Sequence, residues 1–114
     1  MKFSETDKFS GEFKRLSRKY KSLPEDLEEF KKVVTAIPCG TSKHFATIHV
    51  HDVVKIIKAR LACRYLKGSD KLRIVYVYHE DRQAVVFIEI YFKGEKERED
   101  QQRIRQYIDG SSIK

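Results

Sequence analysis

Residues 7–20 place their apolar side chains three or four positions apart, on one stripe of a helix: Phe9, Phe13, Leu16 and Tyr20. The opposite face of the same segment is basic. Thr6 comes directly before the stripe, where a threonine side chain can accept a hydrogen bond from a backbone N–H of the first turn. The pattern therefore predicts an amphipathic helix over residues 7–20 that begins after Thr6.

A second helix is predicted directly after the first. Ser22 and Glu25 have the spacing of a capping box, in which each side chain bonds a free backbone N–H of the first turn. Apolar residues then recur at helical spacing until Pro38, which cannot continue a helix. Only two or three residues separate this helix, over residues 23–36, from the first one. We therefore expect the two helices to form an αα-hairpin.

Beyond Pro38 the hydrophobic period changes from 3.6 to 2, which is typical of strands. Runs rich in β-branched and aromatic residues predict strands over residues 44–50, 72–78 and 84–92, with a short first strand over residues 2–6. Residues 55–64 have strand composition in their first half. The polar residues 79–83 suit a hairpin connection, and Gly68-Ser69-Asp70 marks a turn. Near the end of the chain, Ile104, Tyr107 and Ile108 return to helical spacing and predict a C-terminal helix over residues 95–108.

These elements predict an α+β fold in a single domain spanning residues 1–114. We expect an antiparallel sheet of three to five strands, with the αα-hairpin on one face and the C-terminal helix packed on that face too. A chain of 114 residues has room for one hydrophobic core. Its 40% of hydrophobic residues is enough to close that core, which excludes a disordered chain.

Cysteine usage and hydropathy indicate the compartment. Cys39 and Cys63 belong to no CxxC pair, and we expect both to be reduced thiols. The first residues lack the apolar segment of a secretion signal, and no apolar run is long enough to span a bilayer. We therefore expect a cytoplasmic protein with no membrane partner.

Positive charge is concentrated in the middle of the chain. Overall there are 24 Lys and Arg against 17 Asp and Glu, a formal net charge of +7. Seven of the cations stand between residues 55 and 73, where Asp70 is the only acidic residue. A small basic domain attracts polyanions, and nucleic acid is the commonest of these. The local excess favours a nucleic-acid site over a general solubility role.

Three of these cations are expected to project from one surface. Lys58 and Arg60 are two residues apart and point to the same side of an extended strand. Arg73 begins the next strand, and an antiparallel connection would bring it beside them. Guanidinium and ammonium groups bond phosphate oxygens with charge assistance, so this arrangement suits a phosphate site. The same pattern also fits a solvated sheet face that carries cations without any site.

Several segments together resemble the RelE/ParE-type toxins, and nearly the whole chain takes part. Residues 58–61 (KARL), 72–76 (LRIVY) and 85–93 (VVFIEIYFK) resemble three strands of the RelE sheet in their order and spacing. Residues 13–20 (FKRLSRKY), with Leu23 and Asp26, resemble the helix pair of that superfamily. The resemblance implies an α+β toxin with a cognate antitoxin as its protein partner.

The activity implied by the resemblance is cleavage of ribosome-bound mRNA, which makes the ribosome and mRNA further partners. In that reaction the ribose 2′-hydroxyl attacks the adjacent phosphate, with no metal and no cofactor. The ParE branch of the superfamily implies a different target, DNA gyrase. A third interpretation is a non-catalytic module that binds RNA or DNA through the same basic residues.

The resemblance also implies roles for individual residues. Lys58 matches the candidate base, Arg60 a clamp on the transition state and Arg73 the arginine that grips the scissile phosphate. Where the RelE pattern has Lys-Arg, this chain has Lys93-Gly94, so one arginine is missing and Lys93 or Lys96 would have to replace it. The general acid would be Tyr91 or Tyr107. The wider RNA-binding set comprises Lys55, Arg64, Lys67, Lys71, Tyr91 and Lys96.

Two further groups have candidate roles of their own. Glu89 is the only acid in the last predicted strand, and it suits an ion pair with a cation of a neighbouring strand better than a general-base role. His49 and His51, with His44 and Asp52 nearby, have the spacing to hold a divalent ion. Paired histidines on a polar segment are more often only solvated, so we predict no metal site.

Overall fold

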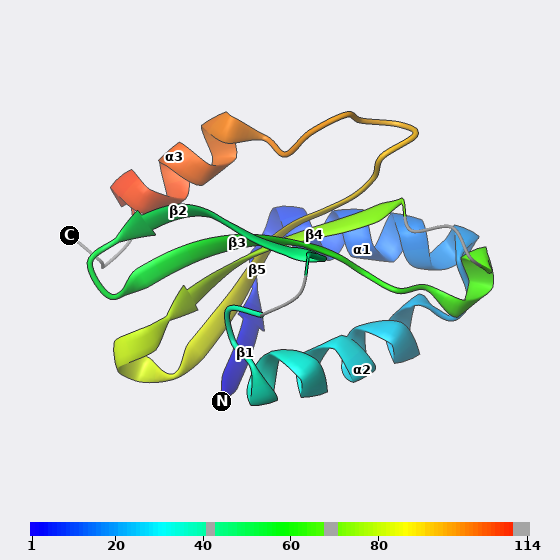
Figure 1. Cartoon of the computed structure of the whole chain (residues 1–114). Helices are drawn as coiled ribbons and strands as arrows, with labels where there is room; N and C mark the ends of the chain where they lie inside the picture. The colour runs from blue at the N-terminus through cyan, green and yellow to red at the C-terminus, as the bar shows by residue number, and fades with distance from the viewer. Residues whose placement is uncertain (41–42, 68–70, 111–114) are drawn as a thin grey trace.

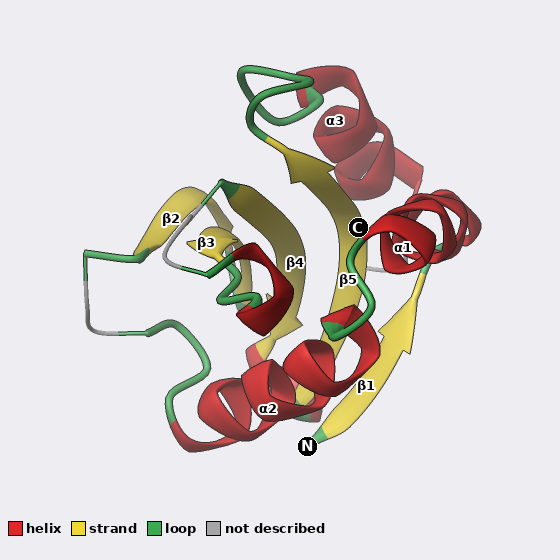
Figure 2. Ribbon diagram, turned by 90° about the vertical axis from the view of Figure 1, so that its right-hand side faces the viewer, coloured by secondary structure: helices red, strands yellow, loops and turns green. Residues whose placement is uncertain are grey.

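The computed structural model describes residues 1–40, 43–67 and 71–110. Its strands form one five-stranded sheet in the order β1-β5-β4-β3-β2 (Figures 1 and 2). Their bounds are β1 Lys2–Glu5, β2 Phe45–His51, β3 Val54–Arg60, β4 Leu72–His79 and β5 Ala84–Phe92. The expected turn at residues 68–70 lies outside the described residues. All five predicted strands are present, although the one expected over residues 55–64 ends at Arg60.

Strands β2 to β5 form an antiparallel meander, as the sequence predicts. β4 and β5 are joined by residues 80–83, where Gln83 adopts a positive φ of 51° in the expected tight connection. β1 pairs with β5 in parallel, so the sheet is mostly antiparallel, as predicted, with one parallel edge strand. Helices α1 (Asp7–Lys19) and α2 (Leu23–Ala36) lie between β1 and β2 in the chain, which then enters the meander at the far edge of the sheet.

Helices α1 (Asp7–Lys19) and α2 (Leu23–Ala36) form the predicted αα-hairpin. The Thr6 side chain accepts a hydrogen bond from the Phe9 N–H (3.2 Å), so the predicted N-cap is confirmed. The capping box at Ser22 is wrong: its hydroxyl makes no capping bond and instead donates to the Asp26 carboxylate (2.7 Å). Ser22 has helical backbone angles, whereas a capping residue is normally extended.

The sheet buries apolar side chains on both faces. On one face, α1 and α2 pack against the strands through Phe9, Leu16 and Phe30, which meet Tyr76 and Phe87. Helix α3 (Gln101–Gly110) lies on the other face, as Figures 1 and 2 show. Ile104 of α3 joins a second cluster of strand residues: Val54, Ile56, Val75, Val77, Ile88 and Tyr91. The expectation that all helices share one face is therefore wrong.

Helix α3 is also shorter than predicted. Residues 95–100 cross the sheet without helical structure, and the helix begins only after Asp100. The Asp100 carboxylate accepts a hydrogen bond from the backbone N–H of Arg103 (3.1 Å), which caps the first turn. The apolar stripe at Ile104, Tyr107 and Ile108 marks the helix correctly, but the predicted start at residue 95 is too early, since the helix begins at Gln101. No helix in the described part of the chain is both long and apolar enough to cross a membrane.

Candidate functional site

Two rows of polar side chains cross the sheet on the face that carries α3. In the first row, Arg60 of β3 is opposite Arg73 of β4, and Arg73 is opposite Tyr91 of β5. In the second row, Val75 of β4 lies between Lys58 of β3 and Glu89 of β5 and is opposite both. Paired residues share a face of the sheet, so the strand register brings Lys58, Arg60 and Arg73 to neighbouring positions.

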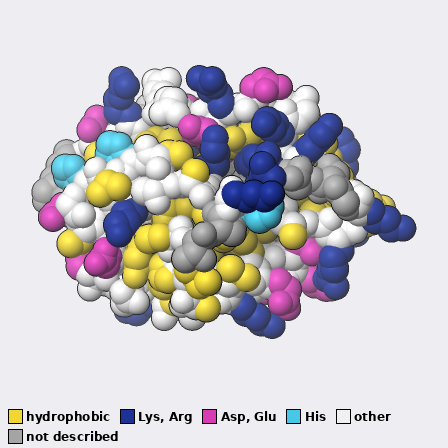
Figure 3. All heavy atoms as spheres, in the orientation of Figure 1, with side chains coloured by type: hydrophobic (Ala, Val, Ile, Leu, Met, Phe, Trp, Pro, Cys, Tyr) yellow, Lys and Arg dark blue, Asp and Glu magenta, His cyan; other side chains and the backbone are white. Residues whose placement is uncertain are grey.

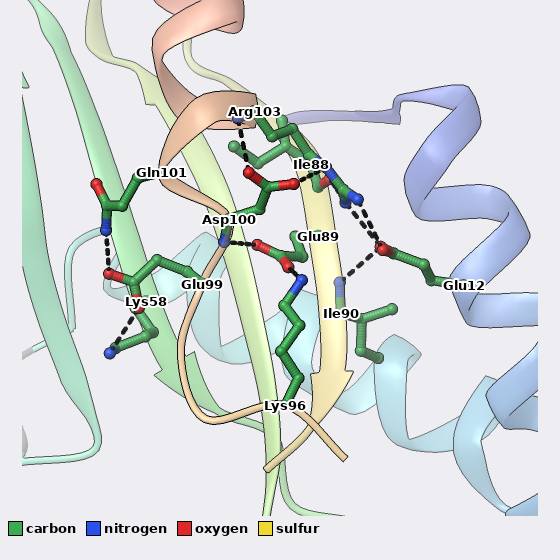
Figure 4. Close-up of polar contacts among 10 residues, drawn as sticks. All are labelled: Glu12, Lys58, Ile88, Glu89, Ile90, Lys96, Glu99, Asp100, Gln101 and Arg103. Carbon is green, nitrogen blue, oxygen red and sulfur yellow. Dashed lines mark hydrogen bonds and ion pairs between the residues drawn. The ribbon is translucent and has the colours of Figure 1, made fainter.

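The ammonium group of Lys58 is bonded to a carboxylate from the C-terminal segment. Lys58 Nζ lies 2.9 Å from Glu99 Oε1, and the Lys58 side chain is 31% exposed. The second oxygen of Glu99 accepts a hydrogen bond from the Gln101 side chain (2.7 Å; Figure 4). Burial acts to raise the pKa of Glu99, but the hydrogen bonds and the charge of Lys58 outweigh it, so this pKa is lowered overall. Glu99 is therefore held as a carboxylate.

Glu89 is fully buried and fixes the segment that carries Glu99. It forms an ion pair with Lys96 and accepts a hydrogen bond from the backbone N–H of Asp100 (2.9 Å; Figure 4). The predicted ion pair of Glu89 is present, but its partner comes from the loop after β5 and not from a neighbouring strand. A buried carboxylate needs such donors because an unpaired one is costly.

An ion pair between α1 and α3 lies against the edge of β5 and bonds its backbone. Both guanidinium Nη atoms of Arg103 lie 2.9 Å from the two carboxylate oxygens of Glu12. The pairing of β1 with β5 ends at Phe87, which leaves the next backbone groups of β5 without a strand partner. Arg103 donates to the Ile88 carbonyl (2.9 Å), and Glu12 accepts from the Ile90 N–H (3.2 Å). The two side chains thus satisfy the backbone where β1 stops.

Tyr91 and Tyr107, the two candidate acids, lie in different surroundings. Burial, with the negative charges of Glu99 and Glu89, raises the pKa of Tyr91 to about 12, and Arg73 acts against this rise. Tyr91 is therefore within the electrostatic reach of both rows. Tyr107 instead bonds the ring of His79 (2.8 Å) and attaches α3 to the end of β4. The structure brings Tyr91 to the cations and keeps Tyr107 away from them.

Two of the predicted RNA-binding cations, Lys55 and Arg64, lie away from the rows. Lys55 is opposite Tyr78, on the face that carries α1 and α2, and lies 3.6 Å from Glu80. Arg64 follows β3 and is bonded to Glu25 and Asp26 of α2, which raise its pKa. Neither residue belongs to the two rows, because strand alternation turns Lys55 away and β3 ends before Arg64.

Exposed lysines lie in the segments that connect β3 to β4 and that follow β5. Lys67 and Lys71 are exposed, as is Lys93, whose backbone N–H bonds the Lys71 carbonyl (2.7 Å). Lys96 is held by Glu89, and its ammonium lies 5.3 Å from the centre of the Tyr91 ring. Figure 3 shows one face of the molecule, on which dark blue Lys and Arg side chains gather in its upper and right-hand parts. Lys71 and Lys93 are exposed neighbours at the start of β4 and the end of β5, next to the row that contains Arg73 and Tyr91.

Gly94 occupies the position of the missing arginine for a steric reason. A Cβ atom there would lie 2.5 Å from the ring of Phe92, closer than atoms of a packed structure approach. Phe92 in turn stacks on Tyr20, with ring centres 5.8 Å apart, so its ring is held in place. The packing of Phe92 therefore favours glycine at position 94.

Among the residues that the structure describes, the histidine pair belongs to no metal-binding group. Residues 1–40, 43–67 and 71–110 contain no group of three or more His, Cys, Asp or Glu side chains arranged to hold a metal ion. His49 and His51 lie on β2, at the edge of the sheet, beyond an irregularity in the pairing with β3. Their spacing in the sequence is not accompanied by a ligand set in this part of the structure.

Three residues of the network were not identified from the sequence: Glu99, Glu12 and Arg103. Each acts across 41 to 91 positions of the chain, and no local pattern marks such contacts. Asp100 carries a usable signal, since an aspartate just before an apolar helical stripe is a common N-cap. Recognition of that cap would have placed Glu99 in the loop over the sheet.

Comparison with known proteins identifies the fold. No protein-family model matches the sequence, and no curated protein matches it. Among solved structures, the chain is similar to the archaeal RelE–RelB complex from Pyrococcus horikoshii OT3, with a TM-score of 0.62 and 12% sequence identity. The match covers 82% of this chain and 94% of the other. The chain therefore has a RelE-like fold, as its sequence segments predict.

Proposed function

We propose that this protein is the toxin of a toxin–antitoxin pair and that it cuts messenger RNA on the ribosome. The observation that carries the proposal is the placement of Lys58, Arg60 and Arg73 at neighbouring positions on one face of a RelE-like sheet. A non-catalytic surface needs only dispersed positive charge. Three cations at adjacent positions can instead bind one phosphate from several directions.

The chemistry suited to these cations is attack by a ribose 2′-hydroxyl on the adjacent phosphate. Negative charge builds up on the phosphate oxygens in the transition state, and cations held in place lower its energy. Arg73 lies centrally, between Arg60 on β3 and Tyr91 on β5, and is the residue proposed to grip the scissile phosphate. The attacking group belongs to the RNA itself, so the reaction needs no metal to generate a nucleophile.

The exposed lysines extend this surface. Lys67, Lys71 and Lys93 are proposed to attract the RNA backbone without contacting the reacting atoms. Such contacts add affinity that falls as salt is raised and that does not depend on sequence. The same contacts suit an mRNA bound in the ribosome, because the backbone of ribosomal RNA is negatively charged too.

The proposed protein partner is an antitoxin. The similar structure from Pyrococcus horikoshii is a complex of RelE with RelB. The net charge of +7 on the present chain favours an acidic partner, because opposite charges speed association and stabilise the complex. We therefore propose that a cytoplasmic protein of the RelB kind binds and neutralises this one.

Expression of the protein without its partner tests the proposal. We expect growth and translation to stop, with new cuts inside the coding regions of mRNA. Growth arrest with DNA damage and intact mRNA would contradict it and favour the gyrase-directed branch of the superfamily. RNA binding with neither arrest nor cleavage would favour a non-catalytic binding module.

A further inference from the structure

Glu99 is placed where it can accept the proton of a ribose 2′-hydroxyl. Glu99 Oε1 is 2.9 Å from Lys58 Nζ, and the Glu99 side chain is only 9% exposed. Attack by a 2′-hydroxyl requires a base, and an amine can accept a proton only in its neutral form. The Lys58 side chain makes its ion pair with Glu99 as an ammonium. The group beside the phosphate site that is ready to accept a proton is therefore the carboxylate.

Glu99 is held in place by the structure around it. The next residue, Asp100, bonds the buried Glu89 through its backbone N–H (2.9 Å) and caps helix α3. Glu89 is also paired with Lys96, three residues before Glu99. The loop is thus attached to the sheet on both sides of Glu99. A catalytic group needs such support, because misplacement by about 1 Å can reduce a rate by roughly 100-fold.

The location of Glu99 also matches the needs of the substrate. The 2′-oxygen and the scissile phosphate belong to the same nucleotide, so the base and the phosphate-binding cations must be neighbours. Lys58 contacts Glu99 and lies on the same face as Arg60 and Arg73. Glu89 does not meet this requirement, because it is fully buried beneath the loop.

We propose that Glu99 is the general base of the RNA cleavage proposed above and that Lys58 stabilises charge beside it. The inference rests on that proposed function. Glu99 takes the proton of the 2′-hydroxyl as the 2′-oxygen bonds to phosphorus and the bond from phosphorus to the 5′-oxygen breaks. The leaving 5′-oxygen takes a proton from water, and Glu99 returns its own proton to the solvent. The products are a 2′,3′-cyclic phosphate and a 5′-hydroxyl, with no change in oxidation state.

The two candidate bases predict different pH dependence. The pKa of Glu99 is lowered, so a Glu99 base is ionised at neutral pH and gives a constant single-turnover rate from pH 6 to 9. A lysine base would instead give a rate that rises about tenfold per pH unit below its pKa. The titratable groups that act on Glu99 or on which it acts are Lys58 from β3 and Tyr91 from β5. Arg73 from β4 acts on Tyr91, and Lys96 from the loop is paired with Glu89. Tyr91, with a pKa of about 12, stays neutral throughout.

The test compares Glu99→Gln with Glu97→Gln, which changes an exposed carboxylate of the same loop. We expect Glu99→Gln to slow single-turnover cleavage of ribosome-bound mRNA by about 100- to 10,000-fold, the usual contribution of a general base. Its RNA affinity should change little, and its residual rate should rise with pH as hydroxide replaces the lost base. Glu97→Gln should cleave at the rate of the unchanged protein. Glu99→Asp, which keeps the carboxylate, should recover part of the activity with a flat pH profile.

Different outcomes separate the two proposals. If the unchanged protein cleaves and Glu99→Gln cleaves equally well, Glu99 is only structural and the inference is wrong while the proposed function stands. If Glu99→Gln cleaves faster, Glu99 competes with the phosphate for Lys58, and the inference is again wrong. If the unchanged protein cleaves no RNA, both proposals fail. Thermal unfolding of Glu99→Gln and Glu99→Asp distinguishes loss of chemistry from loss of fold.

Discussion

Arg60 and Arg73 lie directly opposite each other on strands β3 and β4. Side chains at opposite positions of neighbouring strands are close enough to act on one group. Guanidinium groups bond phosphate oxygens with charge assistance, so a phosphate could accept hydrogen bonds from both residues. The pair therefore links the fold to the proposed chemistry, because the register that aligns the strands also places the two arginines at opposite positions.

Arg73→Ala should remove transition-state stabilisation without unfolding the protein. We expect cleavage to fall about 100- to 1,000-fold, or roughly 3–4 kcal/mol, as for loss of one preorganised charge donor. Lys14→Ala, an exposed cation of α1, is the control and should change the rate little. Single-turnover cleavage and thermal unfolding measure the two effects. Equal small losses in both variants would show that the basic residues contribute only general electrostatic attraction to RNA.

Arg103→Met should destabilise the fold, because it leaves Glu12 and the Ile88 carbonyl without their donor. The side chains of Arg103 and Glu12 are only 15% and 22% exposed, so water replaces the lost contacts poorly. We expect the free energy of unfolding in urea to fall by about 1–3 kcal/mol. Arg105→Met, an exposed residue of the same helix, should be nearly neutral. An equal effect of both variants would mean that the Glu12–Arg103 pair contributes nothing.

His79 should make stability depend on pH. Arg82 can only donate, so its contact with Nδ1 (2.7 Å) fixes the neutral ring, whose Nε2–H donates to the Tyr107 hydroxyl. Burial and the charge of Arg82 lower the pKa of His79, and Asp81 partly opposes this. The unfolded chain therefore binds a proton more readily than the folded one.

The stabilisation from neutral His79 is present in full above the unfolded pKa of about 6.5. It is lost as the pH falls through that value toward the lower folded pKa. We expect the free energy of unfolding to decrease over this window in the unchanged protein, and the decrease to be smaller in His79→Gln. Urea denaturation at a series of pH values measures both slopes. Identical slopes would show that His79 does not carry the effect.

Gly94→Arg should not improve the proposed RNA cleavage, although it restores the Lys-Arg pair of RelE-type sequences. The new Cβ would meet the ring of Phe92 at 2.5 Å and force it away from Tyr20. We expect a loss of about 1–3 kcal/mol in the free energy of unfolding, as for other overpacked positions. Lys93→Arg, at the exposed neighbouring position, should leave stability unchanged. A stable and faster Gly94→Arg variant would contradict this explanation of the glycine.

The hydrophobic pattern was sufficient for most of the fold. The spacing of apolar residues and the composition identified α1, α2 and the four strands of the meander. Buried apolar positions recur with the period of the helix or strand that carries them, so this spacing is visible in the sequence. The same signal cannot name the partner of a strand, so the parallel pairing of β1 with β5 was missed. It also could not place α3, since Ile104 and Tyr107 fit a helix on either face.

Only those residues of the candidate site that lie on strands could be predicted from the sequence. The spacing of Lys58 and Arg60 and the turn before Arg73 were enough to expect them on one surface. Lys55 and Arg64 were grouped with them by charge alone, which does not reveal the face of a strand or the residue where it ends. Glu99 was missed because it reaches Lys58 from a loop that follows two further strands.

The most direct test of the central claim is the cleavage of a defined mRNA bound to purified ribosomes. We expect the protein to cut within the coding region and to leave 5′-hydroxyl ends that a kinase labels without prior phosphatase treatment. A folded variant that lacks Lys58, Arg60 and Arg73 (each changed to Ala) should leave the mRNA intact. Intact mRNA with the unchanged protein, or equal cutting by this variant, would contradict the assignment of the basic face as an RNA-cleaving site.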